Sequence, residues 1–370
     1  MPRTFHNPYN FVRTPSRTEA VLEDPFAGDH DPSKPEYREN HSRYWSERYT
    51  GVIPVRLRTQ TPLFITNPET RRPMKDVTDH YIYDCLEYIP ATALKGMLSS
   101  AYEIITNSRY RVFGKQNFTQ LKYRDGWDKK TYPCSPADCL PDSLHPAKTI
   151  ERLSPADRLF GWVAQERTQG HGAWRGKLRF SNGVYEGEGS PIEKISEGNG
   201  RPLKILGEPK PAQARFYLGD ASGEPQADGL SKEKAGYKSG KKLRGRKVYL
   251  HHTLAHLSKN EEKDEKAEYW DEHQGARMSV LPEYRQPAGE KQCSSQNRSI
   301  TGWIPKRTDF RFDIKVENLT REELGALLAL LSLEQNYFRL GFAKPLGLGS
   351  VSLSIQWNGE EPLPFMTGED

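Results

Sequence analysis

Cysteine is scarce in this chain, and so are long apolar runs. Four cysteines among 370 residues are too few for the covalent framework of a disulfide-rich secreted domain. The first residues, MPRTFHNPYNF, show no apolar run behind a basic start, so we expect no secretory signal. No stretch approaches the ~20 apolar residues that cross a bilayer. The sequence therefore predicts a cytoplasmic protein in a reducing compartment, with no membrane partner.

Hydrophobic residues are also in short supply, at 35 % of the chain against 28 % charged residues. This share is low for a compact globular protein. Because 27 prolines and 30 glycines are spread through the sequence, we expect a real core diluted by long polar loops. The formal net charge of +5 allows a polyanionic partner but does not require one.

Hydrophobic periodicity predicts regular structure in two separated parts of the chain. The first part has a strand at 55–58, a helix that Pro90 opens and Asn107 closes, and a short strand at 176–180. The second part has an alternating strand from Phe310 to Val316, a helix from Arg321 to about Glu334, and a last strand at 351–357. Thr320 and Glu323 form a capping box for the second helix. Residues 61–87 read as a polar loop with a short apolar centre at 81–83.

The order strand, helix, strand, insertion, strand, helix, strand predicts an α+β fold. It is the order of a ferredoxin-like or RRM-like (βαββαβ) core with a long insertion. We divide the chain into an extended N-terminal arm (1–50), the first half of the core (51–184), the insertion (185–305) and the second half with a glycine-rich loop (306–370). The insertion holds a basic run, an acidic cluster and one strand-like stretch at 248–250, and a loop of this length is usually functional or disordered.

Three segments resemble, in order, motifs of the RAMP superfamily of CRISPR-associated proteins. They are IPATALKGMLSSAYE at 89–103, RLFG at 158–161 with KLRFSN at 177–182, and RLGFAKPLGLGSV at 339–351. The likeness is greatest to the Cas-seven-like branch, the backbone subunits of type III effector complexes. Ala91, Ala93 and Asn182 depart from the family pattern. The resemblance implies antiviral defence, binding of guide RNA (crRNA), contact with complementary target RNA and assembly with other CRISPR effector subunits.

The matched segments supply candidate RNA-binding residues. The start of the first helix has free N–H groups that suit a phosphate, next to the Thr92 hydroxyl and the Lys95 ammonium group. Glycines allow a backbone to approach a ligand closely. The candidates of the glycine-rich loop are Arg339, Gly341, Lys344, Gly347 and Gly349.

The basic run between Lys232 and Lys247 is a second candidate for RNA contact. Its residues Lys241, Lys242 and Arg244 either neutralise phosphates or form a solvated face. Tyr237 and Tyr249 could stack on bases.

The resemblance also implies in-line cleavage of target RNA, assisted by an aspartate and a divalent ion such as Mg²⁺. The family's aspartate lies in the loop before the first-helix motif, where Asp79 is our first choice and Asp76 our second. Asp84 aligns with a structural aspartate, and His80 could assist Asp79. Since some family members only hold the guide, cleavage stays open, and the chain could also be a purely structural, non-catalytic subunit.

Two further possibilities depend on histidine and cysteine. Cys134 and Cys139, with His145 nearby and Cys293 as a fourth ligand, could bind zinc, although unliganded cysteines explain the spacing better. A Cas-six-like guide-processing endoribonuclease would need a catalytic histidine, for which His41 and His80 are the candidates. The helix motif at 89–103 argues against that enzyme.

Overall fold

In the computed structural model, the described residues are 8–15, 44, 48–111, 134–164, 172–206, 211–227, 229–231, 233–251, 270–271, 286–287, 293–333 and 338–356. No helix within these ranges is both long enough and apolar enough to cross a membrane. The predicted last strand is present as β20, but Trp357 lies outside the described residues.

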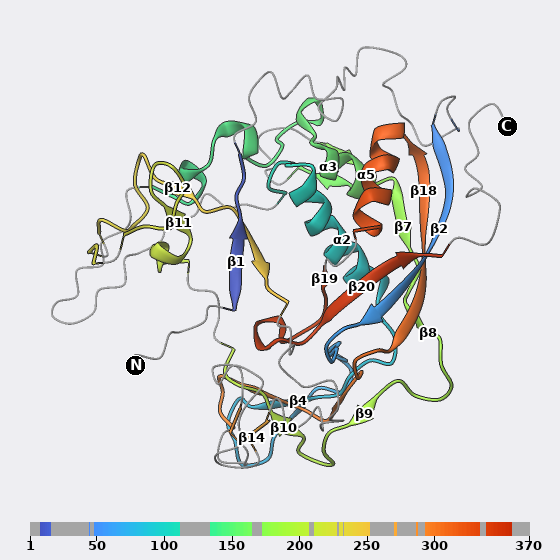
Figure 1. Cartoon of the computed structure of the whole chain (residues 1–370). Coiled ribbons are helices and arrows are strands. Elements are labelled where there is room, and N and C mark those ends of the chain that lie inside the picture. Colours follow the sequence, from blue (N-terminus) through green and yellow to red (C-terminus); the bar gives the residue numbers. More distant parts are fainter. Residues whose placement is uncertain are drawn as a thin grey trace, which may run out of the picture.

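A curled antiparallel sheet of six strands forms the centre of the fold (Figure 1). Its order is β19-β20-β2-β18-β7, and β8 also pairs with β18. The strands are β2 (Tyr49–Thr59), β7 (Leu178–Phe180), β8 (Val184–Tyr185), β18 (Asp309–Leu319), β19 (Phe338–Arg339) and β20 (Ser350–Ile355). Along β18 the apolar side chains from Phe310 to Val316 are buried, and they alternate with polar side chains that are more exposed. This pattern confirms the predicted strand.

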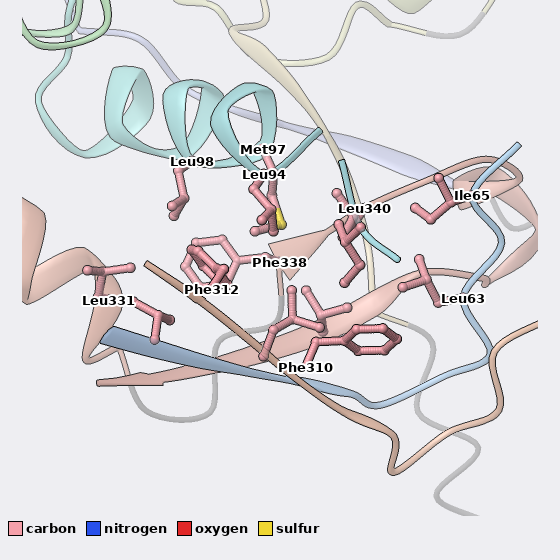
Figure 2. Packing of buried hydrophobic residues seen from close by; sticks show 14 of the residues in the cluster. Leu63, Ile65, Leu94, Met97, Leu98, Phe310, Phe312, Leu331, Phe338 and Leu340 are labelled. Carbon is pink, nitrogen blue, oxygen red and sulfur yellow. The ribbon is translucent and has the colours of Figure 1, made fainter. Parts of the chain in front are cut away.

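Two helices, α2 (Ala91–Ile105) and α5 (Arg321–Leu331), cover one face of this sheet (Figure 1). In Figure 2, Leu94, Met97 and Leu98 of α2 point towards the aromatic side chains of the sheet. Both predicted helices are confirmed, although α5 ends at Leu331 instead of near Glu334. The capping box is also present, because Glu323 N–H donates to Thr320 Oγ1 and Thr320 N–H donates to the Glu323 carboxylate, each at 3.1 Å. The chain is thus a mixed α/β protein with few helices.

The prediction of a polar loop at 61–87 was wrong. Leu63 and Phe64 are fully buried in the main core. The segment also supplies β3 (Arg72–Pro73) and β4 (Tyr81–Tyr83) to a second sheet of order β10-β16-β4-β3. Its other strands are β10 (Arg201–Pro202) and β16 (Arg298–Ile300). Strands of two or three residues are too short to show a period, so pattern reading misses them.

The N-terminal arm and the insertion contribute strands that meet each other. Strand β1 (Tyr9–Val12) pairs antiparallel with β13 (Arg246–Tyr249), and we call this pair the ribbon. It lies beside α2 in Figure 1. Residues of the insertion such as Ile195, Leu203 and Ile300 are buried in the main core. The remaining elements are α3 (Pro155–Phe160), β5 (Trp162–Val163), β6 (Ala173–Trp174), β9 (Glu193–Lys194), β11 (Leu218–Gly219), β12 (Lys242–Leu243), β14 (Trp270–Asp271), β15 (Gln286–Pro287) and β17 (Gly302–Trp303), together with 3₁₀ turns at Ala137–Cys139, Asp142–Leu144, Ile150–Arg152, Ala214–Phe216 and Lys344–Leu346.

Candidate nucleic-acid interface

Some of the N–H groups at the start of α2 are hydrogen-bonded within the protein. Ala91 N–H donates to Asn182 Oδ1 at 2.9 Å, and the N–H groups of Ala93 and Leu94 donate to the Pro90 carbonyl. Asn182, which departs from the family pattern, therefore acts as a cap from the turn between β7 and β8. The expectation of a fully open helix start is corrected, because part of its donor capacity is used within the protein.

A hollow of about 670 Å³ lies between α2, β13 and the segment 338–344. Apolar side chains such as Met97, Ala101 and Leu340 line part of it. Its polar and cationic lining consists of Thr92, Ser100, Lys247, Tyr249, Arg339 and Lys344. The structure thus brings Thr92 of the first motif together with Arg339, Gly341 and Lys344 of the third motif, and it adds side chains of the ribbon.

The glycine-rich loop owes its shape to contacts with its own protein. Gly341, Gly347 and Gly349 all have positive φ, of 78°, 91° and 77°. A Cβ atom at Gly341 would clash with the Phe64 carbonyl oxygen, and one at Gly349 would clash with the Leu340 carbonyl oxygen. These two glycines therefore allow close backbone packing, whereas we had expected them to make room for a ligand.

The two cations of the loop are held in place by backbone and side-chain contacts. Arg339 donates to Ser350 Oγ and, at 2.9 Å, to the Lys344 carbonyl, and Lys344 Nζ donates to the Gly341 carbonyl at 3.1 Å. Burial, and then the neighbouring Arg339 charge, lower the pKa of Lys344. An anion that entered the hollow would relieve the repulsion between these two charges.

Lys95 lies on the other flank of α2, in a second hollow of about 790 Å³. Burial and the nearby charge of Arg111 lower its pKa. Arg111 itself donates to Ser99 Oγ and, at 2.6 Å, to the Gly161 carbonyl. Both hollows share Thr92, Gly96 and Ser100, which are exposed and one helical turn apart. Lys95 and the glycine-rich loop therefore border the same exposed stripe of α2 from its two sides.

The RLFG motif has a structural role. Arg158 lies in α3, with its Nε 3.6 Å from the Glu323 carboxylate. Gly161 has a φ of 94°, and a Cβ there would approach Gly176 N to 2.9 Å. The motif thus joins α3 to the start of the segment that carries β7.

The basic run borders a third hollow, of about 620 Å³, together with Arg13. There Lys241 Nζ donates to Gln226 Oε1 at 2.7 Å, Lys242 is exposed, and the Arg244 guanidinium lies 5.0 Å from the centre of the Phe11 ring. Lys232 is outside the described residues.

Of the two tyrosines predicted to stack on bases, one is unsuitable. Tyr237 is 2 % exposed and donates its hydroxyl to the Pro211 carbonyl at 2.9 Å, so that prediction was wrong. Tyr249 is half-buried and borders the first hollow. Sequence reasoning missed Tyr9 and Phe11, whose alternating positions in the arm were the only available signal, and it treated Lys247 merely as the end of the basic run.

The loop before α2 presents Asp76 and Asp79 to solvent. Both residues have positive φ, 66° and 58°, in the turn between β3 and β4. Magnesium ions are commonly held by one or two carboxylates together with water and substrate phosphates, so exposed carboxylates of this type are suitable ligands for such an ion. Burial alone would raise the pKa of Asp84, but hydrogen bonds from Arg72 and Thr301 lower it overall, which agrees with a structural role.

His80 cannot assist Asp79 in this structure. The ring is fully buried, with Nδ1 2.8 Å from the Ser294 carbonyl and Nε2 2.8 Å from Ser299 Oγ. A carbonyl only accepts, so Nδ1 donates to Ser294, and both ring nitrogens are engaged in hydrogen bonds within the protein. His80 is therefore unsuited to be the catalytic histidine of a Cas-six-like endoribonuclease. The other candidate, His41, lies outside the described residues.

The predicted zinc ligands are not gathered into one group. No three His, Cys, Asp or Glu side chains are clustered for a metal ion anywhere in the described ranges. Burial raises the pKa of Cys139 to about 11, which opposes the thiolate that zinc needs. His145 Nε2 donates to the Ala137 and Leu140 carbonyls, and Cys293 is next to the Ser294 that binds His80. Packing and hydrogen bonding account for these residues without zinc.

Several solved structures resemble the chain at low sequence identity. A chain of a type IV-B CRISPR complex matches 86 % of this chain and 96 % of its own length, with 12 % identity and a TM-score of 0.34. A chain of the type III-B Cmr-beta complex bound to cognate target RNA matches 83 % and 98 %, with 10 % identity and a TM-score of 0.31. Oligomeric Cmr4 from Pyrococcus furiosus matches 82 % and 98 %, with 12 % identity and a TM-score of 0.26.

A comparison with curated protein sequences finds no match. The family model of the RAMP superfamily, however, matches residues 56–352. This range contains all three sequence motifs, the residues that line both hollows flanking α2, and the central sheet except for the first part of β2 and the end of β20. The chain therefore belongs to the RAMP superfamily.

Proposed function

We propose that this chain is a guide-RNA-binding subunit of a type III CRISPR effector complex, with a Cas-seven-like role and other effector subunits as partners. Membership of the RAMP superfamily supports this proposal. We also propose that its core is ferredoxin-like. The strand order β20-β2-β18-β7, with α2 after β2 and α5 after β18, supports that assignment.

The hollow between α2 and the glycine-rich loop is the observation that carries the proposal. Thr92 is exposed on one side of it, and Arg339 and Lys344 are fixed on the other. Hydroxyl and cationic groups on a rigid wall are the contacts that position a sugar–phosphate backbone. Lys95 offers a further cation across the exposed stripe of α2.

Co-purification tests the assignment to an effector complex. The chain is expressed with its operon partners, and the bound RNA is sequenced. Guides that carry repeat tags and start at a uniform position support an effector subunit. Turnover of free precursor by the isolated chain would support guide processing instead, and absence of bound RNA would refute the proposal.

A pair of lysine variants tests the site. Lys344→Gln should weaken binding of single-stranded RNA and reduce the salt dependence of log K by about 0.7 if one phosphate contact is lost. Lys315→Gln is the matched control, because Lys315 is exposed on the face of β18 turned away from the helices. Equal affinities of the two variants would contradict this site.

Cleavage of target RNA by Asp79 and Asp76 is part of the proposal. In this chain the exposed carboxylates would orient the attacking 2′-hydroxyl and hold a divalent ion. The ion, when bound, would stabilise negative charge at the phosphate. The assembled complex is incubated with complementary labelled RNA and Mg²⁺, and Asp79→Ala and Asp76→Ala variants are compared. Cutting that is undiminished at every position in both variants would refute the assignment.

A non-catalytic guide-holding subunit is the second candidate. The observation in its favour is that no third acidic or histidine side chain joins Asp76 and Asp79 in the described structure. Wild-type complex that binds target RNA and leaves it intact in the same assay would establish this alternative.

A further inference from the structure

One face of the ribbon carries three aromatic side chains and one lysine. In the antiparallel register, Tyr9 is opposite Tyr249 and Phe11 is opposite Lys247, so these four side chains share a face. Lys247 Nζ lies 4.1 Å from the centre of the Tyr9 ring and 5.0 Å from that of Tyr249. We call these four residues the stacking face.

The stacking face continues at both of its ends. On one side, Lys344 Nζ of the glycine-rich loop is 5.9 Å from the centre of the Tyr249 ring. On the other side, Phe11 meets Tyr217 edge-on at 6.1 Å and has the Arg244 guanidinium 5.0 Å from its centre. Lys247 and Tyr249 also line the first hollow. A track of cations and π faces therefore leads from the glycine-rich loop across the ribbon.

The ribbon is anchored through its opposite face. Arg246 is buried there, with its Nε 2.8 Å from a carboxylate oxygen of Glu103 in α2 and its guanidinium 4.4 Å from the centre of the Tyr110 ring. The two strands pair along four residues each. The stacking face is consequently not needed to attach the ribbon to α2, and its four side chains keep part of their surface exposed.

We propose that the stacking face is a base-stacking platform for single-stranded RNA that extends beyond the hollow at the glycine-rich loop. This inference rests on the proposed function, because it assumes that the hollow holds RNA. Unpaired bases stack on aromatic rings whatever their sequence, and interleaved cations neutralise the phosphates between them. The platform would thus lengthen the bound RNA segment without adding sequence preference.

The test compares full-length variants by fluorescence anisotropy with a labelled, unstructured single-stranded RNA and with a duplex of the same sequence. The double variant Tyr9→Leu/Phe11→Leu keeps apolar, strand-compatible side chains but removes the rings. It should weaken single-strand binding by about fivefold or more per ring and leave duplex binding unchanged. Lys247→Gln should lower the salt slope by about 0.7.

Matched controls separate stacking from folding. Tyr185→Leu removes a half-buried ring from β8, at the edge of the sheet opposite the glycine-rich loop, and Lys315→Gln removes a cation from the far face. Hydrogen exchange at Asn10 and Val248 reports whether the ribbon remains paired. Ribbon variants that stay paired and bind single-stranded RNA as tightly as the controls overturn the platform. If Lys344→Gln still weakens binding in that case, the proposed function stands, whereas a wild-type chain that binds no RNA refutes both.

Discussion

Loss of the Glu323 carboxylate should strongly destabilise the fold. This carboxylate lies 3.0 Å from Lys177 Nζ and 3.6 Å from Arg158 Nε, and it accepts the Thr320 N–H at 3.1 Å. The side chains of Lys177 and Glu323 are only 2 % and 3 % exposed, and that of Arg158 is 10 % exposed. Glu323→Ala removes the carboxylate from between two buried cations, which costs about 3–5 kcal/mol. The lost capping bond adds about 1 kcal/mol.

This loss is comparable with the whole stability of many domains. Urea unfolding followed by tryptophan fluorescence measures it. Glu322→Ala is the matched control, because Glu322 is exposed in the same first turn of α5 and should cost no more than about 1 kcal/mol. If the two variants unfold within about 1 kcal/mol of each other, the ion cluster does not stabilise the core and the reasoning fails.

Three further predictions follow from the same structure. Gly349→Ala should distort the glycine-rich loop and abolish RNA binding, because the added Cβ would clash with the Leu340 carbonyl oxygen. Gly325→Ala is the control and should leave binding intact, because open space surrounds the added Cβ at that position. Anisotropy titration of RNA with both variants measures the difference. Although burial opposes it, the Lys177 and Arg158 charges hold the pKa of Glu323 below its ordinary 4.5, so the stability from its charge is present above pH 4.5 and lost as the pH falls through the lower folded value. Wild type should therefore lose more unfolding free energy than Glu323→Gln on acidification below pH 4.5. Equal losses in the two proteins, measured by urea unfolding at each pH, would disprove this. His80→Ala should cost about 2–3 kcal/mol, because it removes two buried hydrogen bonds and leaves Ser299 unsatisfied; a midpoint of unfolding equal to that of wild type would contradict it.

Local patterns in the sequence predicted the central elements well. The alternation from Phe310 to Val316 identifies β18, because a half-buried strand imposes a period of two on its side chains. The stripe of Leu94 and Leu98 identifies α2, and the Thr320–Glu323 capping box places the start of α5. Each signal is contained in a short window, so no knowledge of distant contacts is needed. The short strands β3, β4 and β16 carry no such signal and escaped prediction.

The composition of the candidate site was only partly readable from the sequence. The motifs indicated Thr92, Arg339 and Lys344, but not that the ribbon completes the wall of their hollow. Tyr237 lies within the basic run and Tyr249 just after it, and they have the same chemistry, yet Tyr237 is buried and Tyr249 borders the hollow. No property of the residues themselves distinguishes them, because burial depends on which other segments cover each ring.

The two helices, the long strands of the sheet and the family motifs can be predicted from the sequence, since these features depend on local periodicity and residue type. The pairing of β1 of the N-terminal arm with β13 of the insertion, and the approach of Lys344 to the Tyr249 ring, are seen only in the folded chain. Pairing between remote segments depends on chain closure and on complementary packing, and these are properties of the whole fold.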